Sequence, residues 1–261
     1  MSPPTPRATL AILAMATCRM AWRERWHLGL MGLLVTGWLL ALLAEPIALT
    51  ETGHTSAILA GFWLRLASLF EMALLVILTI SRERQQRLLE CLLALPLPRA
   101  TLFWGRLLGF HLLALGVAAL CGLLMLPLLP GPVTLAWSLT LACELLILAT
   151  LALLLALAIR QPTLAMTGTA GFYLLARLLP AIRLMADEPG HELPGWSGHI
   201  LDGTLTGLAW LLPDLERFTV SHWLAYGHVT WESFGPMLVE TALQVLLWSA
   251  IGLIDLARKP F

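Results

Sequence analysis

The sequence predicts an all-α polytopic membrane protein with six transmembrane helices. Three observations lead to this prediction: an apolar composition, six long apolar stretches, and an uneven distribution of arginine. The chain is 59% hydrophobic and only 12% charged, whereas a soluble domain carries roughly 25% charged residues. Because it has too little polar surface to face water on every side, we expect lipid to be its main solvent.

Six apolar stretches are long enough to cross a bilayer as helices. A hydrocarbon core of about 30 Å requires about 20 apolar helical residues. The predicted spans are 28–48, 57–80, 103–129, 134–159, 163–184 and 234–257. No separate soluble domain is expected, so residues 1–261 form one transmembrane domain.

The basic residues predict how these spans are oriented. Of the 16 Lys and Arg residues, 12 lie before the first span, around the loop between the second and third spans (including Arg106 at the start of the third), at the end of the fourth or after the sixth. The loops on the opposite side carry mainly Asp and Glu, with Arg217 as their one basic residue. Since basic loops remain in the cytoplasm, we expect a bacterial inner-membrane protein with both termini cytoplasmic.

Two further segments are expected to lie at the membrane surfaces. Residues 8–27 mix an apolar run with arginines and with Trp22 and Trp26, which favours an amphipathic helix in the cytoplasmic interface. The alternative is that this segment extends the first span. In the outer segment 187–233, residues 200–212 are apolar but too short to span, which predicts a re-entrant or surface helix.

The chain lacks the residues of a nucleotide-hydrolysing site. Its one lysine, Lys259, lies near the C-terminus, whereas a phosphate-binding loop places lysine directly after a glycine-rich turn. The four cysteines show no C-x-x-C spacing and are interpreted as small buried hydrophobes. We therefore expect no catalytic residue, metal, cofactor or nucleic acid to belong to this chain.

The loop between the second and third spans is predicted to contain a short amphipathic helix. Residues 82–95 place leucines on one side and charges on the other, and Pro96 and Pro98 end the helix. Such a helix at the cytoplasmic face either dips into the membrane or docks into a groove of another protein.

This loop resembles the signature of permease subunits of type-2 ABC exporters. That signature reads E-x-x-x-x-T-L-x-x-L-L-x-x-P-[VL]-x-R, followed after a short gap by G-[KR]. The matching positions here are Glu83, Leu88, Leu92, Leu93, Pro96, Leu97, Arg99, Gly105 and Arg106. Leu-Leu stands where the family has Thr-Leu, and the glycine that usually precedes it is absent.

The resemblance implies a role for the loop and a set of partners. It implies that 82–99 is a coupling helix that contacts a separate ABC ATPase subunit, with Glu83, Leu88, Leu92, Pro96, Arg99, Gly105 and Arg106 as the coupling residues. Two copies of that subunit would hold ATP-Mg, and a second copy of this chain or a homologous permease would complete the transporter.

Several polar side chains interrupt the predicted spans. The candidates for a translocation path are Arg65, Glu71, Glu144, Arg177, Glu240 and Gln244. A charge at mid-membrane costs roughly 2.5–3.5 kcal/mol, so we expect these residues to face one another or a wet cavity. Arg177 is predicted to pair with Glu144 or Glu240. Interhelical ion pairing without a transport role is the alternative interpretation.

Taken together, these patterns predict the membrane-spanning subunit of an ATP-driven exporter that is not itself catalytic. One alternative is an ion-coupled secondary transporter that uses Glu71, Glu144 and Glu240 as carriers. Another is a membrane scaffold of an envelope assembly complex. No residue selects the transported substrate.

Overall fold

The computed structural model describes residues 6–22, 25–44, 55–86, 98–186, 203–208, 211–218, 229 and 231–258. All regular elements within these ranges are helical, which confirms the predicted all-α class. The elements are α1 (Pro6–Trp22), α2 (Arg25–Ala44), α3 (Thr55–Gln85), α5 (Arg99–Met125), α6 (Gly131–Ala158), α7 (Pro162–Ala186), the 3-10 turn η2 (Trp231–Ser233) and α10 (Phe234–Arg258).

Five of these helices, α3, α5, α6, α7 and α10, are long and apolar enough to cross a membrane. They coincide with the second to sixth predicted spans, so the chain has the architecture of a polytopic helical membrane protein. The first predicted span, 28–48, overlaps α2, which ends at Ala44. Residues 45–48 lie outside the described residues, and a sixth span stays a prediction.

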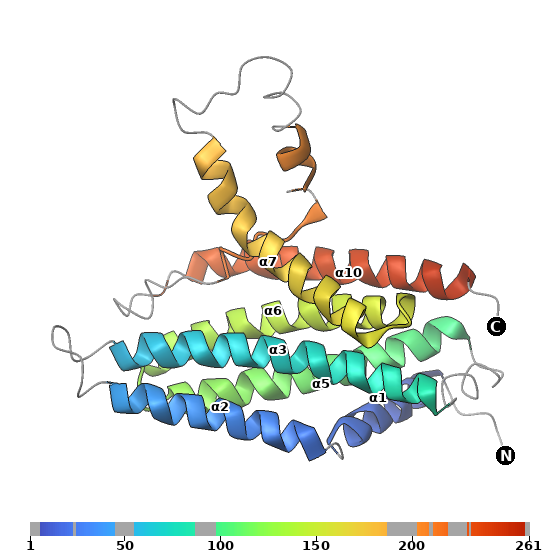
Figure 1. Ribbon diagram of the computed structural model, residues 1–261, viewed down its shortest axis with the longest axis horizontal. Helices are drawn as coiled ribbons and strands as arrows, with labels where there is room; N and C mark the ends of the chain where they lie inside the picture. The colour runs from blue at the N-terminus through green and yellow to red at the C-terminus, as the bar shows by residue number, and fades with distance from the viewer. Residues whose placement is uncertain are drawn as a thin grey trace.

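Helix α6 forms the centre of the bundle. It contacts α3, α5, α7 and α10, and buried side chains occur all round it. A helix that is apolar on every side is expected at such a position. Figure 1 shows α2, α3, α5 and α6 running side by side, with α10 beyond α6 and α7 crossing over them.

The helix termini that carry the predicted cytoplasmic arginines lie together at one end of the bundle. The C-terminal ends of α3, α6 and α10 lie there, together with α1 and the N-terminal ends of α5 and α7 (right side of Figure 1). Side-chain contacts from Arg84 to Ile159 and from Arg99 to Leu256 link these ends. We call this region the basic end.

Helix α3 is longer than the predicted span 57–80, because it continues through Arg82, Glu83 and Arg84 to Gln85. Residues 81–85 contain no proline or glycine, so nothing interrupts the backbone hydrogen bonds of the helix after Ile80. The charged start of the predicted coupling helix 82–99 is thus the last turn of α3. Residues 87–97, with Leu88, Leu92 and Pro96, lie outside the described residues.

The predicted interfacial segment 8–27 is not one helix. Its first part belongs to α1, which ends at Trp22, and its last part belongs to α2, which begins at Arg25. The two helices run in different directions in Figure 1. Helix α1 packs along α5 at the basic end.

The described part of the outer segment folds back onto the bundle. Residues 203–208 are helical, and residues 211–218 run over the helices with Leu212, Leu215 and Phe218 buried. Burial of these apolar side chains explains why the segment returns to the protein instead of extending into water.

Candidate functional site

A cluster of three charged side chains lies inside the bundle. Arg65 comes from α3, Glu144 from α6 and Arg177 from α7. Arg65 Nε is 3.4 Å from one oxygen of Glu144, and Arg177 Nη1 is 3.9 Å from the other. The Arg65 and Glu144 residues are 5% and 1% exposed. One buried carboxylate therefore serves two guanidinium groups, and we call the three residues the charge cluster.

Arg65 has further partners that fix its position. Its Nη1 donates to the carbonyl of Phe218 at 3.0 Å, and its Nη2 donates to Thr140 Oγ1 at 2.7 Å. Its guanidinium also lies 5.7 Å from the centre of the Trp137 ring, within the range of a cation–π interaction. Arg65 thus joins α3, α6 and the outer segment.

The predicted pairing of Arg177 is resolved in favour of Glu144. Among the described residues, no ion pair joins Arg177 to Glu240, whose Oε1 instead accepts a hydrogen bond of 2.6 Å from the backbone amide of Asp214. Gln244 Nε2 donates to the carbonyl of Leu211 at 3.3 Å, and the Trp248 indole donates to Gln244 Oε1 at 2.9 Å. Glu240 and Gln244 therefore fasten the outer segment to α10.

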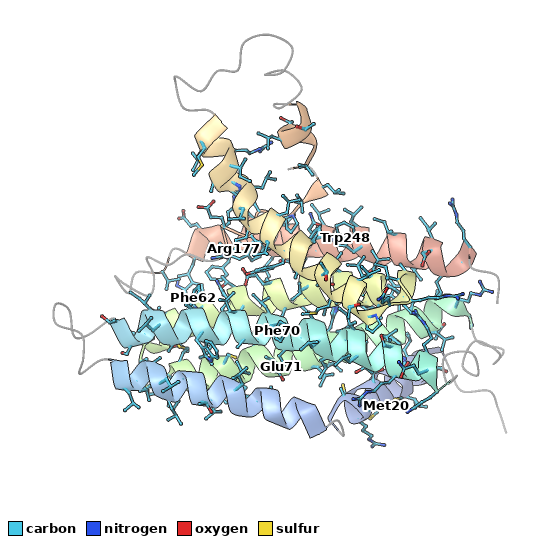
Figure 2. The ribbon with its side chains drawn as sticks, viewed as in Figure 1. Met20, Phe62, Phe70, Glu71, Arg177 and Trp248 are labelled. Atoms are coloured by element: carbon cyan, nitrogen blue, oxygen red, sulfur yellow. The ribbon has the colours of Figure 1, made fainter. Side chains whose placement is uncertain are left out.

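Glu71 lies apart from both groups. It is 1% exposed and borders a cavity between α3, α2 and α5, to which Met31, Leu112 and Leu113 contribute. Figure 2 shows Glu71 well separated from Arg177. The six predicted path residues consequently occupy three separate places and do not form one continuous line.

A second ionic contact lies at the basic end. Glu83 in the last turn of α3 is 2.6 Å from Arg106 Nη1 of α5, and the two side chains are only 4% and 9% exposed. Arg106 also donates to Thr17 Oγ1 of α1 at 3.3 Å. The Glu83–Arg106 pair thus ties three helices together at one point.

Two glycines let α1 approach the backbone of α5. A Cβ atom at Gly105 would lie 2.7 Å from Leu13 Cβ, and one at Gly109 would lie 2.9 Å from the carbonyl oxygen of Ala14. The Gly-x-x-x-Gly spacing of residues 105–109 permits such close helix packing. This spacing is the signal in the sequence that could have identified the α1–α5 contact.

The Cys18 thiol lies in this same contact and donates to the Gly109 carbonyl at 3.4 Å. Burial raises the pKa of Cys18 above its ordinary value. A thiol with a raised pKa stays protonated at neutral pH, so Cys18 contributes a neutral packing contact at this position.

Two more arginines bind the ends of other helices. Arg84 donates to the carbonyls of Ala156, Leu157 and Ile159 at the end of α6, over distances of 2.7–3.2 Å. Arg99 donates to the last carbonyls of α10 at 2.9 and 3.2 Å. A cation is favourable at a helix C-terminus, because it satisfies unpaired carbonyls and the helix dipole. Arg84 was not among the predicted site residues.

Comparison with known proteins adds no relative. Models of known protein families give no match to this chain, and a search of curated proteins gives none either. The class of the chain therefore rests on its own features. It is a multi-pass helical membrane protein with a buried charge cluster and an arginine-rich end that joins several helices.

Proposed function

We propose that this chain is the membrane-spanning subunit of an ATP-driven exporter of the type-2 ABC class, in the bacterial inner membrane with both termini in the cytoplasm. It would form the translocation path with a second copy or a homologous permease, and a separate ATPase subunit would bind at the basic end. The observation that carries the proposal is the position of the signature-like residues 83–106, which flank the loop at that end.

The contacts around this loop suit the transmission of force. A displacement of the loop acts on the end of α3 and on the start of α5. The Glu83–Arg106 pair would transmit this displacement to α1. Arg84 would transmit it to α6, and Arg99 would transmit it to α10. A push at one place would therefore reach five helices.

The burial of these residues divides the predicted coupling residues into two groups. Glu83, Gly105 and Arg106 are buried within the chain, so in this proposal they position the helices and do not touch the ATPase. In this proposal the residues that contact the ATPase directly are Leu88, Leu92 and Pro96 of the loop and the exposed Arg99.

The carboxylates do not favour an ion-coupled carrier. Such a transporter would need Glu71, Glu144 and Glu240 to line one ion route. Glu144 instead pairs with Arg65, and Glu240 holds a backbone amide. Glu71 lies in a third place, on the side of α3 that faces α2 and α5.

The test is affinity purification of the tagged chain from native membranes in a mild detergent, with mass spectrometry of the proteins that accompany it. We expect an ABC ATPase subunit at about one copy per chain. Leu92→Arg should abolish this association, whereas Glu232→Lys, a charge reversal at an exposed position before the start of α10 and away from the basic end, should preserve it. Absence of any ATPase from the wild-type preparation after chemical cross-linking contradicts the proposal, as does equal recovery with both variants.

A further inference from the structure

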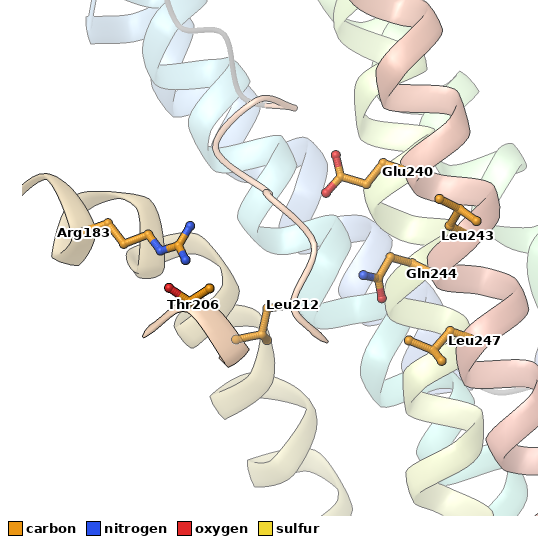
Figure 3. Close-up of a pocket in the computed structure, with 7 residues that line it drawn as sticks. All are labelled: Arg183, Thr206, Leu212, Glu240, Leu243, Gln244 and Leu247. Atoms are coloured by element: carbon orange, nitrogen blue, oxygen red, sulfur yellow. The ribbon is translucent and has the colours of Figure 1, made fainter. Parts of the chain in front are cut away.

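A cleft with polar and apolar walls lies between α7, the outer segment and α10 (Figure 3). Arg183 lines it from α7, Thr206 and Leu212 line it from the outer segment, and α10 contributes the rest. The α10 residues are Glu240, Leu243, Gln244 and Leu247. An adjoining hollow shares Arg183, Leu212 and Glu240 and extends to Asp214 and Arg217.

The two walls carry opposite charges that do not neutralise each other. Asp214 and Arg217 form their own ion pair at 2.7 Å. Arg183 donates to the carbonyl of Leu205 at 3.0 Å, and within the described ranges no carboxylate lies in ion-pair distance of it. Glu240 accepts the Asp214 amide through Oε1. Arg217 attracts it from a longer distance, and no cation of the described residues lies within ion-pair distance of it. The cleft thus offers one guanidinium and one carboxylate.

An apolar strip continues from the charged part of the cleft. Glu240, Leu243, Gln244 and Leu247 follow the spacing that places residues on one face of a helix. Leu243 is 63% and Leu247 is 38% exposed. This face of α10 therefore has a polar start and an apolar continuation, as an amphiphile has a headgroup and a chain.

We propose that the cleft binds a zwitterionic amphiphile, a molecule with a primary ammonium, a phosphate or carboxylate, and an apolar chain. The anionic group would bind Arg183, the ammonium would bind Glu240, and the chain would lie along Leu243 and Leu247. A charge beside hydrocarbon is unfavourable unless it is paired, and one molecule with both charges satisfies both walls. A purely anionic lipid would leave the Glu240 carboxylate facing an anion. The site does not depend on an ATPase partner.

The test is native mass spectrometry of the purified chain with added lipids of identical acyl chains. Phosphatidylethanolamine should give about tenfold more adduct than phosphatidylglycerol, because only the former supplies a charged hydrogen-bond donor to Glu240. Phosphatidylcholine should also bind less, because its quaternary ammonium has no N–H. Glycerophosphoethanolamine, the same headgroup without chains, shows whether the headgroup alone suffices, and we expect it to bind weakly.

Two variants probe the walls separately. Arg183→Gln and Glu240→Gln should each reduce the phosphatidylethanolamine adduct about tenfold, and Glu240→Gln keeps an oxygen to accept the Asp214 amide. Glu232→Gln and Arg258→Gln alter exposed charges outside the cleft and should leave the adduct unchanged. Equal binding of the three lipids, or unchanged binding in both cleft variants, would show nonspecific annular lipid and overturn the proposal.

A measurement on the unaltered chain covers the case in which a cleft variant fails to fold. A phosphatidylethanolamine with a photoreactive acyl chain should label peptides that contain Leu243 and Leu247 of α10. Labelling spread evenly over exposed leucines of other helices, such as Leu40 and Leu112, would contradict the site. Excess phosphatidylethanolamine should suppress the α10 label, whereas excess phosphatidylglycerol should not.

Discussion

Arg65 and Arg177 bind the same carboxylate but differ in how firmly the protein holds them. Arg65 is 5% exposed and has partners on α6 and in the outer segment besides Glu144. The Arg177 side chain is 33% exposed, and its nitrogen lies 3.9 Å from Glu144. A buried ion pair at short distance depends strongly on both partners, whereas a pair with one partly exposed partner at longer distance contributes little.

This difference gives a prediction for the charge cluster. Glu144→Gln should lower the free energy of unfolding by about 3–5 kcal/mol, because it leaves the buried Arg65 without its counter-charge. Arg177→Gln should lower it by less than about 1 kcal/mol. Thermal unfolding in detergent, followed by tryptophan fluorescence, measures both changes.

A double variant serves as the control for this prediction. Arg65→Met combined with Glu144→Leu removes both buried charges and should be more stable than Glu144→Gln alone. Equal melting temperatures for Glu144→Gln and Arg177→Gln would show that the cluster does not contribute to stability as described.

At the scale of elements, the contact between α1 and α5 depends on the absence of two side chains. Gly109 faces a backbone oxygen of α1, which cannot move aside as a flexible side chain could. Gly116, on the same helix α5, has nothing within 4 Å of a Cβ placed there. The two glycines therefore provide a matched pair for substitution by alanine.

We predict that Gly109→Ala destabilises the chain by about 1–3 kcal/mol, as overpacking of a close contact does. Gly116→Ala should be neutral or slightly stabilising, because alanine favours the helix over glycine. Thermal unfolding of the two variants, compared with that of the unaltered chain, measures the effect. Identical melting temperatures would show that α1 does not rest on α5 in this way.

The end of α6 depends on a side chain from another helix. Arg84 of α3 donates to three of its last carbonyls. This contact joins the ends of α3 and α6 by side-chain hydrogen bonds. Loss of the guanidinium should therefore loosen the last turn of α6 locally, without unfolding the bundle.

Hydrogen exchange tests this expectation. Arg84→Gln should accelerate amide exchange at residues 156–159 about tenfold, because hydrogen bonds from a charged donor are lost. Arg82→Gln, at an exposed position in the same turn of α3, should leave these amides unchanged. Acceleration throughout α6 would indicate global destabilisation and contradict a local role.

At the scale of the whole molecule, arginines far apart in the chain gather at one end of the bundle (Figure 1). The positive-inside rule predicts that this end faces the cytoplasm. A reporter active only in the cytoplasm should therefore be active when fused after Gln86 or Arg258. It should be inactive when fused after Thr50. The opposite pattern would reverse the predicted topology.

The local features of the fold could be predicted from the sequence. Apolar length identified all five helices that the structure shows to be long enough to cross a membrane, because hydropathy is a property of each segment alone. The predicted second span ended at residue 80, whereas α3 continues to Gln85. The charged residues from Arg82 onward were assigned to a separate helix, although charged residues do not interrupt a helix as proline does.

For the candidate site, the sequence predicted which residues take part but not how they pair. Buried charges must find partners, and this requirement singled out Arg65, Glu144 and Arg177. It could not decide between Glu144 and Glu240 for Arg177, nor reveal that Glu240 holds the Asp214 amide. Those outcomes depend on which helix faces are adjacent.

The sequence by itself determined that this is a multi-pass helical protein and which of its ends are basic, because composition sets the solvent of each segment. The tertiary structure decided which charges meet, that α1 rests on Gly105 and Gly109, and that the outer segment returns to the bundle. These contacts join segments distant in the chain. They arise from the packing of α3, α5, α7 and α10 around α6 and of α1 and α2 against α5 and α3, which no single segment encodes.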